Sequence, residues 1–122
     1  MSINSYQDLT VWQKGMQLAE DCYRLTRRFP REELFGLTPQ IRRAAASVPA
    51  NIAEGWGREG TREYIQFLRV AQGSLKELET HLILSQRVGL VTEGEIAATL
   101  NLCGEMGKMI RSLIGSLQRK LP

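Results

Sequence analysis

The stretch Asn51–Tyr64, NIAEGWGREGTREY, carries the spacing G-x-G-x-x-G at Gly55, Gly57 and Gly60. That spacing is typical of dinucleotide-binding turns, which join a strand to a helix in a parallel sheet. The residues before it, SVPANIAE, continue a helical pattern instead, and no segment alternates long enough to predict a strand. No Gly-Lys-Ser/Thr follows the glycines, which excludes a P-loop. The stretch therefore predicts a corner between two helices of an all-α protein.

Each glycine of this corner is predicted to allow a particular backbone conformation. Gly55 is expected to end the preceding helix as a left-handed C-cap, and Gly57 to relieve a tight turn. Gly60 frees the backbone just before Thr61, the expected cap of the next helix.

The helix that enters the corner is expected to begin at Thr38-Pro39, because Thr suits an N-cap and Pro suits the first helical position. Pro49 falls in the middle of its apolar pattern. Proline removes one backbone hydrogen bond and crowds the carbonyl four residues earlier, here that of Ala45. We therefore expect a kink or a break near residues 46–48.

Three further helices are expected at residues 9–29, 61–88 and from Thr92 to the C-terminus. Pro30 and Gly89 supply stop signals, and the last helix opens with a Thr92–Glu95 capping box. Four helices joined by short loops predict an antiparallel up-down four-helix bundle with a Pro-kinked second helix. We expect residues 1–122 to form one domain.

Two features of these helices bear on how they pack. The first helix carries two apolar stripes, which is more than a monomeric bundle needs: Trp12, Met16, Ala19 and Tyr23 form one, and Leu18, Cys22, Leu25 and Phe29 the other. The last two helices contain interior glycines, each costing about 1 kcal/mol relative to alanine: Gly73, Gly104, Gly107 and Gly115. Close helix–helix approach is the expected compensation.

The composition is that of an ordinary globular protein, with 43% hydrophobic and 24% charged residues. No apolar run reaches the roughly 20 residues of a membrane span, and the N-terminus lacks the order of a secretory signal. We expect a cytoplasmic protein without a membrane partner. The net charge is +3 and most of the basic residues are arginine, which permits an RNA or DNA partner without requiring one.

No catalytic, cofactor or metal site is predicted. The single histidine, His81, has only Glu77 at helical spacing, which is at most half a metal site; a surface or interface position is preferred. Cys22 and Cys103 are interpreted as buried thiols, with a disulfide as the alternative. The chain is expected not to be an enzyme.

A polar line steps along the second helix, and a similar one along the third. Their members are Arg43, Ser47, Asn51, Glu54 and Arg58, and then Arg69, Gly73, Ser74, Glu77 and Thr80. A solvated face, a structural network and a ligand site all remain open. In a network, Arg42 or Arg43 is expected to pair with Glu77, and Asn51 to cap backbone groups freed by Pro49.

Basic side chains flank two parts of this line. Arg42 and Arg43 lie on the second helix, and Arg58 and Arg62 lie beside the start of the third, where exposed N–H groups attract anions. A solvated turn and a phosphate or carboxylate contact are both compatible with this start. The four arginines are the tentative nucleic-acid-binding residues.

The runs QIRRAAASVPANIAEGWGRE and EYIQFLRVAQGSLKELETHLILSQRVGLV closely resemble the family called 23S rRNA-intervening-sequence proteins. The resemblance covers roughly residues 5 to 115. It implies a small four-helix bundle that assembles as a homopentamer, with no established biochemical activity. A similar bundle is the accessory protein of diversity-generating retroelements, which is more basic, so its role is not transferred to this chain.

The family motif falls on Arg42, Arg43, Ser47, Pro49, Asn51, Glu54, Gly55, Gly57, Arg58, Gly73, Ser74, Glu77 and Glu79. The resemblance implies that these residues are mainly structural. It favours a non-enzymatic oligomer that associates with RNA or DNA, and an oligomeric scaffold with a protein partner is the alternative.

Overall fold

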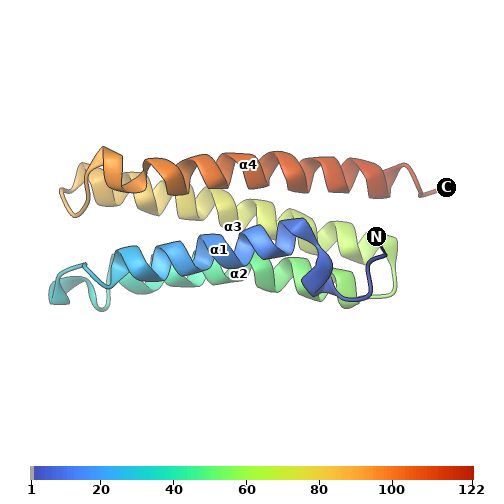
Figure 1. Cartoon of the computed structure of the whole chain (residues 1–122), viewed down its shortest axis with the longest axis horizontal. Helices are drawn as coiled ribbons and strands as arrows, with labels where there is room; N and C mark the ends of the chain where they lie inside the picture. Colours follow the sequence, from blue (N-terminus) through green and yellow to red (C-terminus); the bar gives the residue numbers. More distant parts are fainter. Residues whose placement is uncertain (1) are drawn as a thin grey trace.

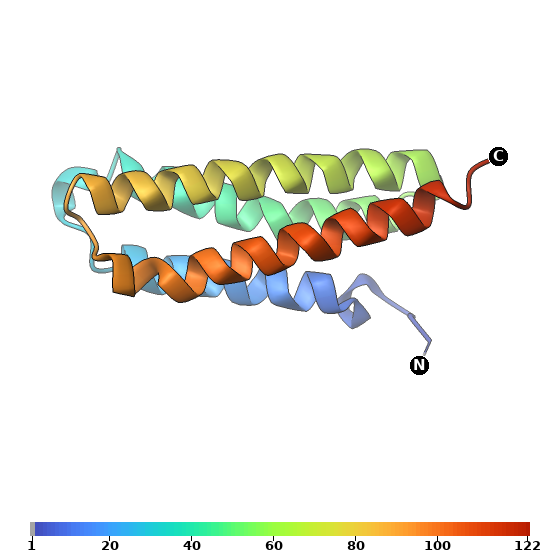
Figure 2. The same ribbon diagram turned by 90° about the horizontal axis from the view of Figure 1, so that it is seen from above.

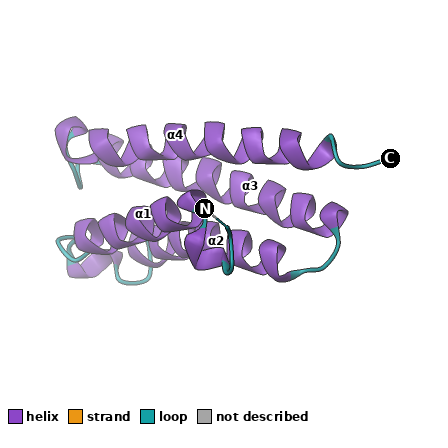
Figure 3. Cartoon of the chain, turned by 45° about the vertical axis from the view of Figure 1, so that its right-hand side comes forward, coloured by secondary structure: helices purple, strands orange, loops and turns teal. Residues whose placement is uncertain are grey.

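The apolar repeats of the sequence fold into four α-helices, which the computed structural model describes over residues 2–122. They are α1 (Thr10–Thr26), α2 (Leu37–Gly57), α3 (Thr61–Arg87) and α4 (Glu93–Gln118), with 3-10 turns at Tyr6–Asp8 and Arg31–Glu33. Successive helices run in opposite directions, so both ends of the chain lie at one end of the bundle (Figure 1). Figure 3 shows helices joined by loops, and no strand occurs in residues 2–122. The predicted all-α four-helix bundle is confirmed.

Each helix contributes a buried stripe to one core. Its largest fully buried side chains are Leu18 and Cys22 of α1, Ile41, Val48 and Ile52 of α2, Leu68, Leu75, Leu78 and Leu82 of α3, and Ile96, Met106 and Ile110 of α4. Burying one such side chain contributes about 1.5–3 kcal/mol. None of the helices in residues 2–122 has the length and apolarity that crossing a membrane requires.

Helix α1 buries one of its two apolar stripes. Leu18 and Cys22 are fully buried, whereas Met16 and Tyr23 on the other stripe are each 40% exposed. The helix ends at Thr26, before the predicted end at Phe29. Helix α1 therefore keeps an apolar strip on the outside of the subunit.

The first helical residue of α2 is Leu37, two residues before the predicted Pro39, and Thr38 is not its cap. The backbone N–H of Leu37 donates to Glu33 Oε1 at 3.0 Å, so a side chain from the preceding turn satisfies the helix start. Thr38 lies inside the first turn and is buried.

The predicted break at Pro49 does not occur, because α2 is continuous from Leu37 to Gly57. The bend at Pro49 stays a prediction. The proline ring is buried against α1, where a Cβ added at Gly15 would lie only 3.2 Å from Pro49 Cβ. Pro49 therefore occupies the space that the missing side chain of Gly15 leaves.

The α2–α3 corner differs from its predicted form. Among residues 2–122 only Gly89 has a positive φ, so Gly55 does not adopt the predicted left-handed conformation. Gly55 lies inside α2, and Gly57, predicted to relieve a tight turn, is the last residue of that helix. The chain instead leaves the helix through extended backbone at Arg58 and Gly60. Gly60, not Thr61, is the N-cap residue of α3.

Gly55 serves close packing between α2 and α3. A Cβ there would lie 2.8 Å from Phe67 Cβ and 3.0 Å from Tyr64 Cδ1, both on α3. Atoms at that separation overlap, so no larger residue fits without displacement. A Cβ at Gly57 would meet nothing within 4 Å.

The signals at the α3–α4 turn are confirmed. Gly89 has φ +85°, its N–H donates to Gln86 O at 3.0 Å, and Leu90 N–H donates to Ser85 O at 2.9 Å. These two bonds form a Schellman motif. The Thr92–Glu95 capping box then opens α4, with both reciprocal hydrogen bonds present.

The interior glycines of α3 and α4 do not mediate close approach inside the subunit. A Cβ added at Gly73, Gly104 or Gly107 would meet nothing within 4 Å, and one at Gly115 would meet only the Arg119 side chain. Figure 2 shows α4 crossing the bundle at a tilt to α3. The sequence prediction is wrong here, because glycine spacing does not reveal what stands opposite each glycine.

Candidate nucleic-acid interface

Arg42 is held within the subunit. Its Nε donates to Thr26 Oγ1 at 2.8 Å, and its guanidinium lies 4.5 Å from the centre of the Tyr23 ring. Thr26 in turn donates to Cys22 O at 2.7 Å. Arg42 therefore joins α2 to the last turn of α1 by a hydrogen bond and a cation–π contact.

The other three predicted arginines differ in whether their guanidinium groups contact a carboxylate or an aromatic ring within the subunit. Arg58 Nη2 lies 2.8 Å from Glu54 Oε2, and its guanidinium lies 5.0 Å from the Phe67 ring centre. Arg43 and Arg62 are exposed and form no ion pair with the residues that the structure describes. Arg42 lies on α2 and Arg58 directly follows the end of that helix, sixteen residues later, which is about 24 Å along the helix axis. The four arginines therefore do not converge on one point.

The middle of the two polar lines forms a network between α2 and α3. Ser47 Oγ and Ser74 Oγ lie 2.8 Å apart, and Asn51 Nδ2 donates to Ser47 Oγ at 2.9 Å and to Ser47 O at 2.8 Å. The carbonyl that Pro49 deprives of a partner is that of Ala45, so Asn51 does not cap the group it was predicted to cap.

The predicted pairing of Arg42 or Arg43 with Glu77 is wrong. Arg42 contacts Thr26 and Tyr23 instead, and Glu77 Oε2 lies 3.5 Å from His81 Nε2. Neither ring nitrogen of His81 has a hydrogen-bond partner, although both are buried. Across residues 2–122, no three His, Cys, Asp or Glu side chains gather in a way that would hold a metal ion.

The two cysteines are buried free thiols. Burial raises the pKa of Cys22 to about 12 and that of Cys103 to about 12, and nearby negative groups add to both shifts. A thiol with so high a pKa is a poor nucleophile at neutral pH. Neither side chain is chemically prepared for covalent catalysis.

Most basic side chains are free of ion pairs. Of the sixteen Lys and Arg residues, five pair with a carboxylate within residues 2–122, which leaves eleven without such a partner. Exposed cations without partners remain available to phosphate groups.

A basic row runs along α3 and faces the α4 side of the bundle. Arg62, Arg69 and Lys76 follow one another at seven-residue intervals, all three exposed, and therefore share one helical face. Two cations on α4 are exposed as well: Arg111 borders α3, and Lys108, one turn earlier, lies toward Val11 of α1. The seven-residue spacing was visible in the sequence, but its link to α4 depended on which helices are neighbours. We call these five residues the basic face.

A groove opens between α3 and α4 within the basic face. Its volume is about 300 Å³. Leu75 and Cys103, both almost fully buried, form its floor. Gly73, Gly104 and Gly107 line it and project no side chain into it. We call this feature the α3/α4 groove.

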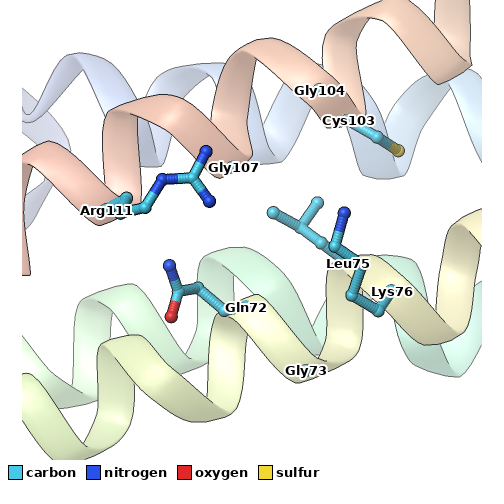
Figure 4. Close-up of a pocket in the computed structure, with 8 residues that line it drawn as sticks. All are labelled: Gln72, Gly73, Leu75, Lys76, Cys103, Gly104, Gly107 and Arg111. Carbon is cyan, nitrogen blue, oxygen red and sulfur yellow. The ribbon is translucent and has the colours of Figure 1, made fainter.

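Polar side chains border the α3/α4 groove on both helices. Gln72 and Arg111 reach into the space between the helices from opposite sides, and Lys76 extends from α3 further along (Figure 4). Lys76 Nζ shares its charge with Glu79 Oε1 at 3.0 Å, whereas Arg111 has no carboxylate partner in residues 2–122. The groove therefore combines an apolar floor with a cationic rim.

Comparison with known proteins identifies the fold and the family. A crystal structure of a protein with unknown function from the S23 ribosomal protein family of Bacteroides thetaiotaomicron superposes with a TM-score of 0.78. It is 25% identical, and the match covers 86% of this chain and 98% of that one. No curated protein matches this chain. The family described as 23S rRNA-intervening sequence protein matches residues 7–112. With most of its length inside that match, the chain belongs to the 23S rRNA-intervening sequence protein family.

Proposed function

We propose that this chain is a non-enzymatic cytoplasmic protein that assembles into a homo-oligomer and associates with nucleic acid. The observation that carries the proposal is the basic face, where five exposed cations on two helices include four without a carboxylate partner in residues 2–122. Phosphate contacts by Lys and Arg supply most of the affinity of non-specific nucleic-acid binding.

The outer strip of α1 supports assembly. Met16 and Tyr23 are each 40% exposed, and Val70, Ile83 and Leu84 on α3 are exposed to a similar degree. Exposed apolar side chains on two helices are available for contacts between subunits. The resemblance implies a pentamer, which would carry roughly +15 at +3 per copy and attract polyanions at long range.

The sequence-predicted arginines remain candidates within this proposal. Arg43 and Arg62 are the stronger pair, because both are exposed and unpaired within residues 2–122. Arg42 and Arg58 already use donors inside the subunit, so they contribute fewer contacts to a phosphate.

The test is binding of a fluorescent oligouridine across a salt series. We expect the logarithm of the association constant to fall linearly with the logarithm of salt, by about 0.7 per phosphate contact for a single strand. Binding that ignores salt, or no binding at low salt, would remove the proposal. Sedimentation of the same sample checks the assembly, and a stable monomer would contradict it.

A scaffold with a protein partner is the second candidate, and one observation favours it. Phe35 is 93% exposed and Leu34 55%, in the loop between α1 and α2. Val88, 59% exposed, lies where α3 ends, at the same end of the bundle (Figures 1 and 2). Exposed large apolar groups of this kind serve protein contacts. Capture of a protein partner that depends on Phe35, without nucleic acid, would favour this candidate.

A further inference from the structure

The α3/α4 groove is open space that the subunit does not use. A Cβ at Gly73, Gly104 or Gly107 would meet no atom within 4 Å, so nothing inside the chain requires these positions to lack a side chain. Alanine is the better helix former at all three. The space is therefore free for a group from outside the subunit.

The residues that line the groove indicate the chemical character of a group that would bind there. Leu75 and Cys103 present an apolar floor, and the lining glycines have no side chain that would keep a planar ring away from the backbone. Arg111 offers an unpaired guanidinium and Gln72 an amide at the rim. A fitting group therefore has a flat, weakly polar part joined to an anion.

The volume of the groove and the charges around it further restrict which ligands it can bind. A volume of about 300 Å³ is at the lower end of small-ligand sites. Arg69 lies seven residues before Lys76, about 10.5 Å along α3, and Arg62 lies a further seven residues before Arg69. Cations therefore continue beyond the groove, as a chain of phosphates requires and a single free phosphate does not.

We propose that the α3/α4 groove receives one base of a single-stranded nucleic acid, with its phosphates held by Arg111, Lys76 and Arg69. This inference rests on the proposed function and names the surface and the strandedness of its ligand. The base lies over Leu75 and the glycine backbones, and the Arg111 guanidinium contacts its phosphate or stacks on its face. A duplex binds more weakly, because its paired bases cannot enter the groove.

Two variants test the groove and one serves as control. Gly104→Leu combined with Gly107→Leu fills the groove, and the subunit tolerates it because both positions face open space and leucine favours helix. Arg111→Gln removes the rim charge. Arg31→Gln removes the same charge from an exposed position in the Arg31–Glu33 turn, which forms no ion pair within residues 2–122 and which no binding role has been proposed for. Circular dichroism and thermal melting report whether each variant is folded.

Fluorescence anisotropy with oligouridine measures the outcome at low salt. We expect Arg111→Gln and the double leucine variant each to weaken binding by at least roughly tenfold, as loss of a charge-assisted contact or a stacked base does. Arg31→Gln is expected to change affinity less than about threefold, the size of a non-specific charge effect. An RNA duplex of the same length is expected to bind at least roughly tenfold more weakly than the single strand.

Each contrary result has one meaning. If the double leucine variant binds oligouridine as the wild type does, the groove inference is overturned and the proposed function stands. If the wild type binds no oligouridine, both are overturned. Equal binding of duplex, or tight binding of free uridine monophosphate, assigns the ligand to another source and overturns the inference. A changed oligomeric state of the double leucine variant assigns the groove to a subunit contact and overturns it too.

Discussion

The α2–α3 side and the α3–α4 side of the bundle use glycine in opposite ways. At Gly55 the missing side chain lets α3 approach so closely that a Cβ would lie 2.8 Å from Phe67 Cβ. At Gly104 and Gly107 the missing side chains face nothing within 4 Å. Gly55 stabilises the subunit because it permits close packing of α2 against α3. Gly104 and Gly107 lower helix stability and leave a groove between α3 and α4. The difference shows that α3 is fully packed on its α2 side, whereas its α4 side leaves space that the subunit does not fill.

The largest effect is expected at the closed side. Gly55→Val places a branched side chain against Phe67 and against the carbonyl oxygen of Tyr64, which would lie 3.2 Å from the added Cβ. The backbones of α2 and α3 cannot separate freely to make room for it. We expect the free energy of unfolding to fall by about 3 kcal/mol, the upper range for overpacking. Urea denaturation measures it.

Gly57→Val is the matched control, two residues away in the same helix. A Cβ there would meet nothing within 4 Å and the residue is exposed, so the change is expected to stay within about 0.5 kcal/mol. Equal losses in both variants would mean that the α2–α3 contact is not the cause.

The polar part of the closed side predicts the next effect. Ser74 is buried and its hydroxyl lies 2.8 Å from that of Ser47. Ser74→Ala leaves the Ser47 hydroxyl with Asn51 alone, at a cost of about 1.5 kcal/mol. Thermal or urea unfolding checks this, with the exposed Ser112→Ala on α4 as control. A loss no larger than that of Ser112→Ala would show that the network adds no stability.

The sequence predicted the helices because apolar periodicity and end signals are local. The Gly89 stop and the Thr92–Glu95 box depend only on residues a few positions apart, and both are confirmed. Gly55 was predicted to end a helix and Gly104 to let two helices approach, whereas the close contact is at Gly55 and not at Gly104. Only the position of the neighbouring helix decides this, and it is not local information. Thr38 failed as a cap because Glu33, four residues before Leu37, already accepts the first N–H of the helix.

The candidate site was less predictable for the same reason. Arg42 meets Thr26 and the Tyr23 ring only after α1 and α2 pack together, so its engagement was hidden in the sequence. The placement of Arg111 across the α3/α4 groove from Gln72 likewise depends on helix order and tilt. Ser47, Asn51 and Ser74 were within reach of prediction, because their spacing placed them on matching polar lines.

The open side predicts a gain in place of a loss. Gly107→Ala adds a methyl group to empty space and removes the entropic cost of glycine in a helix, so the free energy of unfolding should rise by about 1 kcal/mol. Gly15→Ala is the contrasting variant, because its Cβ would lie 3.2 Å from Pro49 Cβ, and no gain is expected there. Destabilisation by Gly107→Ala would mean that the groove is occupied within the folded protein.

The smallest effect concerns how α4, the helix on the open side, is anchored at its start. The backbone N–H of Thr92 donates to Glu95 Oε1 at 2.8 Å, and Arg28 Nη2 of the α1–α2 connection lies 2.8 Å from Glu95 Oε2. The hydrogen bond from the Thr92 backbone, foremost, holds the pKa of Glu95 below its ordinary value of 4.5. A carboxyl whose pKa is lowered by folding stabilises the protein above the unfolded pKa, and this contribution disappears as pH falls through the folded pKa.

Glu95→Gln should therefore be slightly less stable than wild type at pH 7, and the difference should shrink below pH 4.5. Melting temperatures at both pH values, with exposed Glu93→Gln as control, decide it: a deficit that persists undiminished in acid would mean that Glu95 acts through packing and not through its charge.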